Sequence, residues 1–263
     1  MDMSMTSGFV ATHGAGYKLQ MGRWSRRLAP LFARFAGIDG AASVLDVGCG
    51  TGNLGRCLVD DYGVGRVQGL DLSANYIEHA WRTNVDARLS FQVSDARDLP
   101  FADPSFDHKL SMLALQFVPR ADIAVREMRR VTRPGGTLAA ATWDTRGGFV
   151  ALRMILYAAA MLDESGRQAR AAAYTRCLSR PAELSRLWVD AGLSDVVQEM
   201  RVIRMDFASF ADFWSPMRSR DGPVAAYVAS LDEGSKTRLP PSPPPTSMVN
   251  LMDHAPMRRL RGW

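Results

Sequence analysis

A glycine-rich turn between a short apolar segment and an amphipathic segment constrains this chain more than any other feature. Residues 43–47 (SVLDV) have the composition of a buried strand, and they lead directly into the turn GCGTG at 48–52. Residues from Asn53 to about Asp61 have the spacing of a helix. Because glycine has no side chain, a ligand can contact the backbone of such a turn, and the helix that follows presents free N–H groups. The segment therefore predicts a strand–turn–helix ligand site.

Strand and helix patterns alternate along the segment that contains this turn. The further strands that we expect cover residues 66–70, 89–93, 106–112 and 137–143. The expected helices cover residues 25–35, 53–61, 73–84 and 122–131. Ser73 and Asp122 are the expected N-caps of the last two helices. Strands that alternate with helices are joined by right-handed crossovers, so the pattern predicts a parallel sheet with helices on both faces.

Two aspartates lie where the second and third strands end, at spacings that suit a nucleoside. Asp71 lies 23 residues after Gly48, and Asp95 lies 24 residues further on. The carboxyl ends of neighbouring parallel strands meet in one crevice, where one carboxylate can accept ribose hydroxyls and the other an adenine amino group. A nicotinamide dehydrogenase is disfavoured, because Asn53 occupies the place of the third glycine of a dinucleotide-binding turn. The sequence thus predicts an adenosine site.

Five runs together resemble the class I S-adenosylmethionine-dependent methyltransferases, in particular the small-molecule type-11 group. The runs are VLDVGCGTG, GLDLS, SDARDLPF, SFDHKLSMLALQFV and REMRRVTRPGGTLAAATWD, within about residues 40–145. The resemblance implies an α/β fold, a Rossmann-like, doubly wound, seven-stranded sheet with helices on both faces. It also implies S-adenosylmethionine as the cofactor and transfer of its methyl group to a small-molecule acceptor by in-line displacement.

The resemblance assigns most cofactor contacts to the turn and the strand ends. Gly48, Gly50 and Gly52 would pack under the methionine portion of the cofactor, and Asp46 would orient its amino group. Asp71 would hold the ribose. The full set of expected cofactor-binding residues is Arg23, Asp46, Gly48, Cys49, Gly50, Gly52, Asp71, Leu72, Asp95, Ala96 and Met112.

The other members of this set lie around the turn. Leu72 would lie against the adenine, and Asp95 with Ala96 would bind the adenine edge. Met112, at the end of the fourth strand, would face the sulfonium methyl group, together with Leu113 and residues 115–117. Arg23 lies in segment 17–25, which resembles the helix that covers the cofactor in these enzymes. Arg23 would pair with the methionine carboxylate, or it is a solvated surface arginine.

The acceptor side of the expected site is apolar. The residues that can line it are Trp143, Phe149, Met154, Met161, Phe213, Trp214 and Met217, each of which also suits an ordinary core. The segment after the fourth strand lacks the N/D-P-P-Y/F motif of enzymes that methylate amino groups in nucleic acids and proteins, which favours a small organic acceptor. Of the four histidines, His13 is the one near the covering segment, and no catalytic base is assigned.

Charge and apolar patterns limit the partners. The net charge is +5, but five basic residues and one acidic residue in the last 30 positions supply +4 of it. The body of the chain is therefore nearly neutral, and nucleic acid is not favoured as a partner. Three cysteines without C-x-x-C spacing indicate neither a metal site nor a disulfide framework. Without a run of 18 apolar residues or a secretion signal, we expect no membrane association and a cytoplasmic location; the oligomeric state is open.

Four segments are expected along the chain. Residues 1–39 would cover the cofactor, 40–145 would form the binding core, 146–233 would add substrate-side helices and a sixth strand, and 234–263 would be a disordered, proline-rich basic tail. Within the third segment, the expected helices are 149–162, 181–192, 210–217 and 224–231, and the expected strand is 196–207.

The tail departs from the family pattern. Six of the 14 prolines follow Gly234, so we expect neither helix nor strand there, and the last strand of the sheet would be missing. A shifted reading of the coding sequence can yield a helix end, a turn and a strand, and we therefore hypothesise a frameshift near Arg238 to Pro241. A genuine tail is the alternative. Two other functions stay open: a catalytically impaired S-adenosylmethionine-binding protein, and an RNA methyltransferase anchored by the basic tail.

Overall fold

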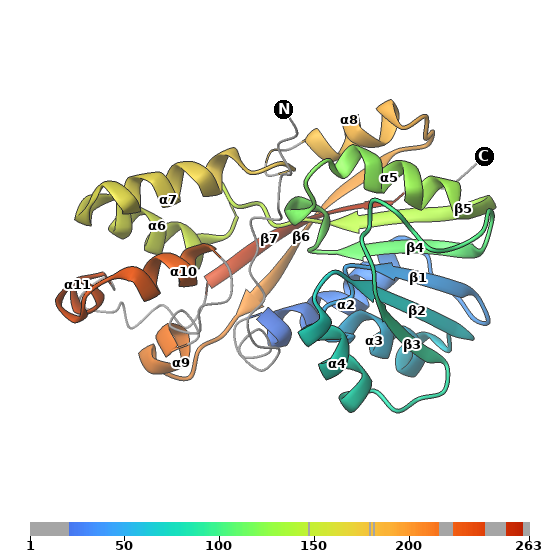
Figure 1. Cartoon of the computed structure of the whole chain (residues 1–263), viewed down its shortest axis with the longest axis horizontal. Coiled ribbons are helices and arrows are strands. Elements are labelled where there is room, and N and C mark those ends of the chain that lie inside the picture. Colours follow the sequence, from blue (N-terminus) through green and yellow to red (C-terminus); the bar gives the residue numbers. More distant parts are fainter. Residues whose placement is uncertain are drawn as a thin grey trace.

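A seven-stranded sheet forms the centre of the molecule. The computed structural model describes residues 21–146, 148–178, 180, 182–215, 223–239 and 251–259. The strand order is β3-β2-β1-β4-β5-β7-β6, with β1 to β5 parallel and β7 antiparallel to both of its neighbours (Figure 1). The strands are β1 (Ser43–Val47), β2 (Arg66–Asp71), β3 (Leu89–Val93), β4 (Phe106–Met112), β5 (Thr132–Ala141), β6 (Val197–Met205) and β7 (Leu251–Arg259). The predicted fold class is confirmed.

Helices pack on both faces of this sheet, and each face has its own apolar cluster. One cluster joins the sheet to α2 (Arg23–Ala36), α3 (Asn53–Tyr62) and α4 (Ala74–Thr83). The other joins it to α5 (Ala121–Arg130) and α8 (Glu183–Asp190). Successive residues of a strand point to opposite faces, so Val44 belongs to the first cluster and its neighbour Leu45 to the second.

The remaining helices gather beyond the carboxyl ends of β4 and β5 (Figure 1). They are α6 (Val150–Leu162), α7 (Glu164–Thr175), α9 (Phe210–Trp214), α10 (Pro223–Ser230) and α11 (Glu233–Arg238). α6 and α7 approach closely at Gly166, where a Cβ atom would lie 1.9 Å from the carbonyl oxygen of Ala159. In the described part of the chain, no helix has the length and apolar composition that crossing a membrane requires.

Two element boundaries differ from the predictions. Asp122 is not the N-cap of α5: the helix begins at Ala121 after Arg120, and Asp122 lies in the first turn, where its carboxylate pairs with Arg120 and Arg126. β5 begins at Thr132 and ends at Ala141, so it starts five residues before the predicted strand 137–143, and Trp143 lies beyond its end. The pairing of β4 with β5 shifts register between Phe106 and His108, and this shift accommodates the extra residues of the turn.

The prediction for the tail is wrong at both described elements. α11 covers residues 233–238, and β7 pairs along its whole length with β6 and at three positions with β5. Pro256 lacks an N–H group, but it lies one position past the last residue that pairs with β5. The expected gap in the sheet, which was the reason for the frameshift hypothesis, is therefore filled by residues 251–259. Residues 240–250 and 260–263 lie outside the described residues.

Candidate functional site

The glycine-rich turn is tied to the neighbouring strand and closed against the end of β4. The N–H groups of Gly48 and Cys49 both donate to the carbonyl oxygen of Leu70, at 2.8 and 2.9 Å. Gly48 has a φ of 75°, and a Cβ atom there would lie 2.2 Å from the Cβ of Ala114. The turn requires glycine at 48 for both reasons. The carboxyl ends of β1, β2 and β4 therefore meet at this turn.

Asp71 connects the turn to the helix that follows β2. Its Oδ2 accepts the N–H of Gly50 at 2.9 Å, and its Oδ1 accepts the N–H of Ser73 at 2.9 Å. Burial raises the pKa of Asp71, although these backbone hydrogen bonds oppose the shift. A carboxylate can accept about four hydrogen bonds, so Asp71 keeps acceptor capacity beyond its backbone contacts, which ribose hydroxyls would use. The next residue, Leu72, is 59% exposed, an unusual exposure for leucine that suits contact with a flat apolar ring.

Asp46 is a buried carboxyl group with an unsatisfied oxygen. The residue is 1% exposed, and its Oδ2 has no hydrogen-bond partner among the residues that the structure describes. Burial, and secondarily the charge of Asp71, raises the pKa of Asp46 to about 8. An unpaired buried carboxyl group destabilises the fold unless a donor reaches it. A cationic amino group placed on the turn would supply that donor.

The third expected strand end is arranged differently. Asp95 binds the guanidinium of Arg97, with Nη2 to Oδ2 at 2.7 Å, and also accepts the backbone N–H of Arg97 at 2.8 Å. The arginine lowers the pKa of Asp95, so the group is anionic at neutral pH. Ala96 packs against the α5-side cluster. Arg97 therefore holds Asp95 in a local turn. No sequence pattern indicated this role of Arg97.

Asn53 positions the covering helix. Its Nδ2 donates to the carbonyl oxygen of Gly22 at 3.2 Å and to the hydroxyl of Ser25 at 2.8 Å. Asn53 is the first residue of α3, so these bonds fix the start of α2 beside the glycine-rich turn. From the sequence, Asn53 was notable only as a replaced glycine, and no pattern indicated this role. Residues 17–20 of the covering segment, and His13, lie outside the described residues.

Arg23 pairs with a residue of the acceptor side. Its Nη1 contacts both carboxylate oxygens of Asp212 at 2.9 Å, and its guanidinium lies over the rings of Trp24 and Phe207, 4.4 and 4.9 Å from their centroids. The Nε of Arg23 is buried and has no hydrogen-bond partner in the described part of the chain. Arg23 is thus not the solvated surface arginine that the sequence left open, since Asp212 of α9 is its counter-ion.

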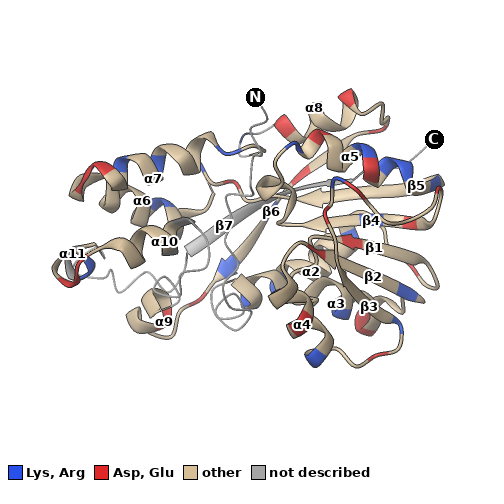
Figure 2. Ribbon diagram, viewed as in Figure 1, with Lys and Arg blue, Asp and Glu red and all other residues tan. Residues whose placement is uncertain are grey.

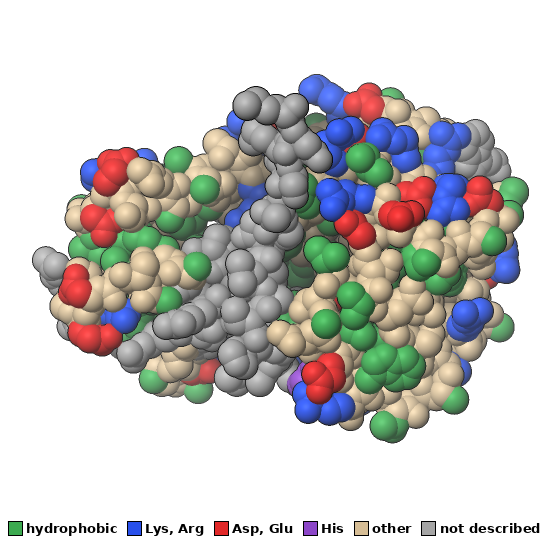
Figure 3. Space-filling model, in the orientation of Figure 1, with side chains coloured by type: hydrophobic (Ala, Val, Ile, Leu, Met, Phe, Trp, Pro, Cys, Tyr) green, Lys and Arg blue, Asp and Glu red, His purple; other side chains and the backbone are tan. Residues whose placement is uncertain are grey.

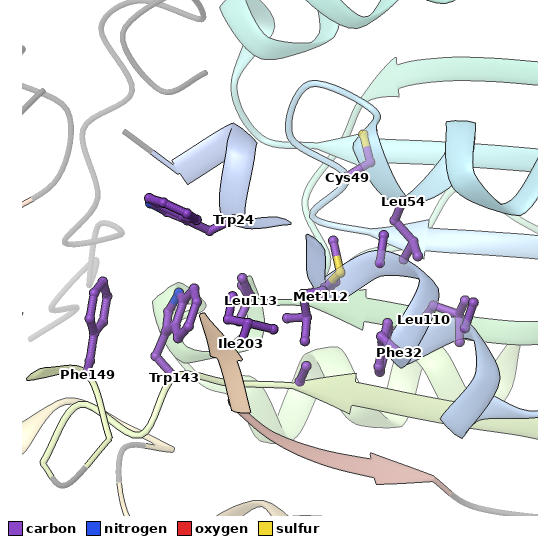
Figure 4. Packing of buried hydrophobic residues seen from close by; sticks show 14 of the residues in the cluster. Trp24, Phe32, Cys49, Leu54, Leu110, Met112, Leu113, Trp143, Phe149 and Ile203 are labelled. Atoms are coloured by element: carbon purple, nitrogen blue, oxygen red, sulfur yellow. The ribbon is translucent and has the colours of Figure 1, made fainter. Parts of the chain in front are cut away.

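The end of β4 carries a strained residue. Leu113 has a φ of 65°, which is unfavourable for a side chain with a Cβ atom, and its N–H donates to Ala141 at 2.8 Å. Met112 and Leu113 are buried in the α2-side cluster, and Trp143 and Phe149 pack together with ring centroids 4.8 Å apart. Figure 4 shows Trp24, Trp143 and Phe149 at one end of this cluster, with Leu113 next to Trp143.

The other expected acceptor-side residues divide into three groups. Phe213 is buried, and Met154 and Trp214 are partly buried against the same cluster. Met161 is 87% exposed on α6, so it belongs to the surface and not to a lining. Met217 lies outside the described residues.

The residues at the strand ends suit an adenosyl amino acid. The turn has three glycines with positive φ, Asp46 lacks a donor among the described residues, and Asp71 can accept further hydrogen bonds. All three lie at the carboxyl ends of the adjacent strands β1 and β2, beside the switch point of the sheet between β1 and β4, where ligands of such folds bind. Within the described ranges, no cluster of three or more histidine, cysteine, aspartate or glutamate side chains could hold a metal ion.

Comparisons with known proteins agree with this arrangement. Residues 45–140 match a family model described as a methyltransferase domain. The chain is 38% identical over 118 residues to 2-methyl-6-phytyl-1,4-hydroquinone methyltransferase of Synechocystis sp., covering 43% of this chain and 37% of that protein. It is 37% identical over 117 residues to the fatty-acid O-methyltransferase of Mycolicibacterium smegmatis, covering 44% and 42%.

A solved structure extends the similarity of fold over nearly the whole chain. Phosphoethanolamine N-methyltransferase 2 of Haemonchus contortus, in complex with S-adenosyl-L-methionine, superposes with a TM-score of 0.59 at 20% identity and covers 95% of this chain and 57% of that chain. The chain spans about two fifths of the length of the curated relatives named above. Residues 45–140 are accordingly similar to the methyltransferase domain that the family model describes.

Proposed function

We propose that the chain is an S-adenosylmethionine-dependent methyltransferase that acts on a small-molecule acceptor. The observation that carries this proposal is the buried, unpartnered carboxyl oxygen of Asp46 beside the glycine turn. The named relatives, which methylate a hydroquinone and a fatty acid, support a small acceptor. The structure with bound S-adenosyl-L-methionine supports the cofactor.

The residues of the site would bind and orient the cofactor. Asp46 would accept a hydrogen bond from its amino group, and Asp71 would accept bonds from its ribose. Gly48, whose Cβ would collide with Ala114, lets the turn pack against the end of β4. The methionine portion of the cofactor would lie on this turn. Asp95 is anionic, and its two oxygens already accept four contacts from Arg97, so the adenine amino group would bind to Asp95 in place of one of them.

Positioning supplies most of the catalysis in this proposal. The bound cofactor supplies an activated methyl group, whose bond to sulfur breaks as the acceptor atom bonds to its carbon, and the electron pair stays on sulfur. Leu113, Trp143 and Phe149 would exclude water and align the acceptor. A proton leaves only when the acceptor atom carries one.

The described basic residues do not favour a nucleic acid as the acceptor. On α5, Arg126 pairs with Asp122, and Arg130 pairs with Glu127 and Asp103. Figures 2 and 3 show acidic and basic side chains intermixed over α5 and the neighbouring end of β5. A surface whose cations are already neutralised releases few counterions on contact with phosphates, so its affinity for RNA is low.

Calorimetry with S-adenosylhomocysteine, the demethylated product, tests the proposal. We expect the full chain to bind this ligand and Asp71→Ala to weaken binding at least tenfold, because two hydrogen bonds to ribose are lost. A variant of similar chemistry at an exposed site, Asp98→Ala, is the control. Absence of binding to the wild-type chain contradicts the proposal, and binding without turnover on any acceptor identifies the catalytically impaired alternative.

A further inference from the structure

We propose that Arg176 and Gln116 form the anion-binding part of the acceptor site, and that the acceptor is an apolar small molecule with one anionic oxygen group, a carboxylate or a phosphate. This inference rests on the proposed function, because it concerns the second substrate of that reaction.

Gln116 is a buried amide with donors that have no acceptor. It lies on the short 3-10 helix η2 (Leu115–Phe117) directly after β4, and it is 5% exposed. Its Oε1 accepts the backbone N–H of Trp143 at 3.0 Å. Because an N–H can only donate, this bond fixes which end of the amide is oxygen, and the NH₂ group points away from Trp143. Among the described residues, no acceptor for that NH₂ group is found.

Arg176 is a cation without a counter-ion in the described part of the chain. It follows the last turn of α7, and its guanidinium lies over the ring of Phe117, 4.8 Å from the centroid. Burial lowers the pKa of Arg176, and no neighbouring carboxylate opposes that shift. Arg23, Arg120 and Arg130, in contrast, each contact a carboxylate. An unpaired, partly buried cation destabilises the fold, and an anionic ligand would remove that penalty.

Both groups lie next to the carboxyl end of β4, where the proposed acceptor would bind. Ala114, two residues before Gln116, touches the glycine turn at Gly48. The guanidinium of Arg146, in the loop after β5, donates to the carbonyl oxygen of Tyr174 and so holds the end of α7 over the ends of β4 and β5. Arg176 and Gln116 therefore lie between the cofactor turn and the helices of the acceptor side.

The surroundings of the two groups suit an apolar ligand body. Leu113, Trp143 and Phe149 are buried side chains at the same strand ends, and none of them can bind a charge by an ion pair. The strained backbone of Leu113 is a further sign of a functional position, since strain is retained where the surrounding structure enforces it. One cationic group, one amide and several apolar side chains together favour a ligand that has an anionic group and an apolar body.

Binding of three probes that share a ten-carbon chain tests this assignment. Decanoate, decyl phosphate and decanol are titrated into the full chain with saturating S-adenosylhomocysteine, and binding is followed by calorimetry. We expect at least one anion to bind about tenfold or more tightly than decanol, because it gains a charged hydrogen bond. The order of decanoate and decyl phosphate identifies the anionic group.

Variants assign the preference to the two residues. Arg176→Met keeps the length of the side chain and should abolish the anion preference, whereas Arg176→Lys should restore part of it. Gln116→Met should weaken the preferred anion about threefold or more. Arg180→Met, which changes an exposed arginine that pairs with Glu183, should leave the preference unchanged.

The outcomes separate this inference from the proposed function. The inference is overturned if no anion binds, if decanol binds as tightly as the anions, or if a folded Arg176→Met variant keeps the preference. Thermal unfolding of each variant establishes that it is folded. Affinity for S-adenosylhomocysteine should stay within about twofold in all of them. If the wild-type chain does not bind S-adenosylhomocysteine, the proposed function fails, and the three probes are then compared without it.

Discussion

The cofactor half of the molecule, from α2 to β5, and the acceptor half, from α6 to α11, satisfy their polar groups in different ways. In the cofactor half, Asp71 is bonded by backbone groups of the turn and of the next helix. In the acceptor half, Arg176 has no counter-ion among the described residues. The first half thus has a carboxylate whose position is fixed by backbone hydrogen bonds, whereas the second has a cation that no described carboxylate fixes. In the proposed function, backbone contacts would therefore set cofactor recognition, and individual side chains would set acceptor recognition.

The largest effect should come from filling the glycine turn. Gly48→Val would place a branched side chain where a Cβ already lies 2.2 Å from Ala114, in a backbone conformation with positive φ. Strain and overpacking together should lower the affinity for S-adenosylhomocysteine by about 100-fold or more. Gly63→Val is the matched control, because Gly63 has a φ of 65° but open space around it. Equal losses in the two variants would mean that backbone strain, and not the contact with Ala114, sets the shape of the turn.

A proton should be released when the cofactor half binds its ligand. Asp46 has a pKa of about 8 in the free protein, so it is mostly protonated at pH 7, and a cationic amino group would favour its ionised form. Calorimetry of S-adenosylhomocysteine binding in buffers with different ionisation enthalpies should detect the release, and Asp46→Asn should abolish it. Affinity should fall by about tenfold in that variant. Unchanged proton release in Asp46→Asn would assign the linkage to another group.

The same residue gives the free protein a pH dependence of known sign. The pKa of Asp46 is raised from 3.8 to about 8 on folding, so the folded state holds the proton more tightly. Its contribution to stability is complete below pH 4 and is lost as the pH rises through 8.

The two halves also differ in how far the sequence alone could describe them. The first four strands of the cofactor half have the predicted positions to within one residue, because their apolar runs are short and bounded by turn residues. α7 was missed, since its sequence ESGRQARAAAYT has no clear apolar period; the cap at Asp163 and the close approach at Gly166 hold it in place. β7 was missed because its proline and basic residues disfavour a strand. Its hydrogen bonding to β6 nevertheless holds residues 251–259 in a strand.

The site residues show the same division. Asp46 lies two residues before Gly48, and Asp71 ends the next predicted strand, so strand positions and spacing sufficed to place them. Arg23 and its partner Asp212 are 189 positions apart, and nothing in the sequence pairs them. Arg176 is notable because no described residue supplies a counter-ion for its guanidinium. Only a structure can show this.

A buried lysine on the α5 face should make the stability of the cofactor half rise with pH. Lys109 is fully buried, and its Nζ donates to the carbonyl oxygen of Phe106; burial lowers its pKa from 10.5 to about 7. The unfolded chain therefore binds more protons between pH 7 and 10, and the free energy of unfolding should increase over that range. Lys109→Met should remove this dependence and stabilise the protein by about 2 kcal/mol at pH 7. Chemical denaturation at several pH values measures both effects, and a Lys109→Met protein with the slope of the wild type would contradict the assignment.

The smallest effect should be found at the contact that joins the two halves. The side chains of Arg23 and Asp212 are 26% and 34% exposed, so their ion pair should contribute about 0.5–1 kcal/mol to the free energy of unfolding. A double-mutant cycle of Arg23→Met and Asp212→Asn in thermal unfolding measures this contribution.

The effects of the two substitutions on ligand affinity should have opposite signs. If Arg23 binds the carboxylate of the cofactor, Asp212 competes for it, so Asp212→Asn should tighten S-adenosylhomocysteine binding two- to threefold while Arg23→Met weakens it. Arg27→Met, which removes a neighbouring pair with Asp206, should change stability without changing affinity. If both substitutions at the Arg23–Asp212 pair weaken binding equally, the pair only clamps α9 against α2, and the cofactor carboxylate is bound elsewhere.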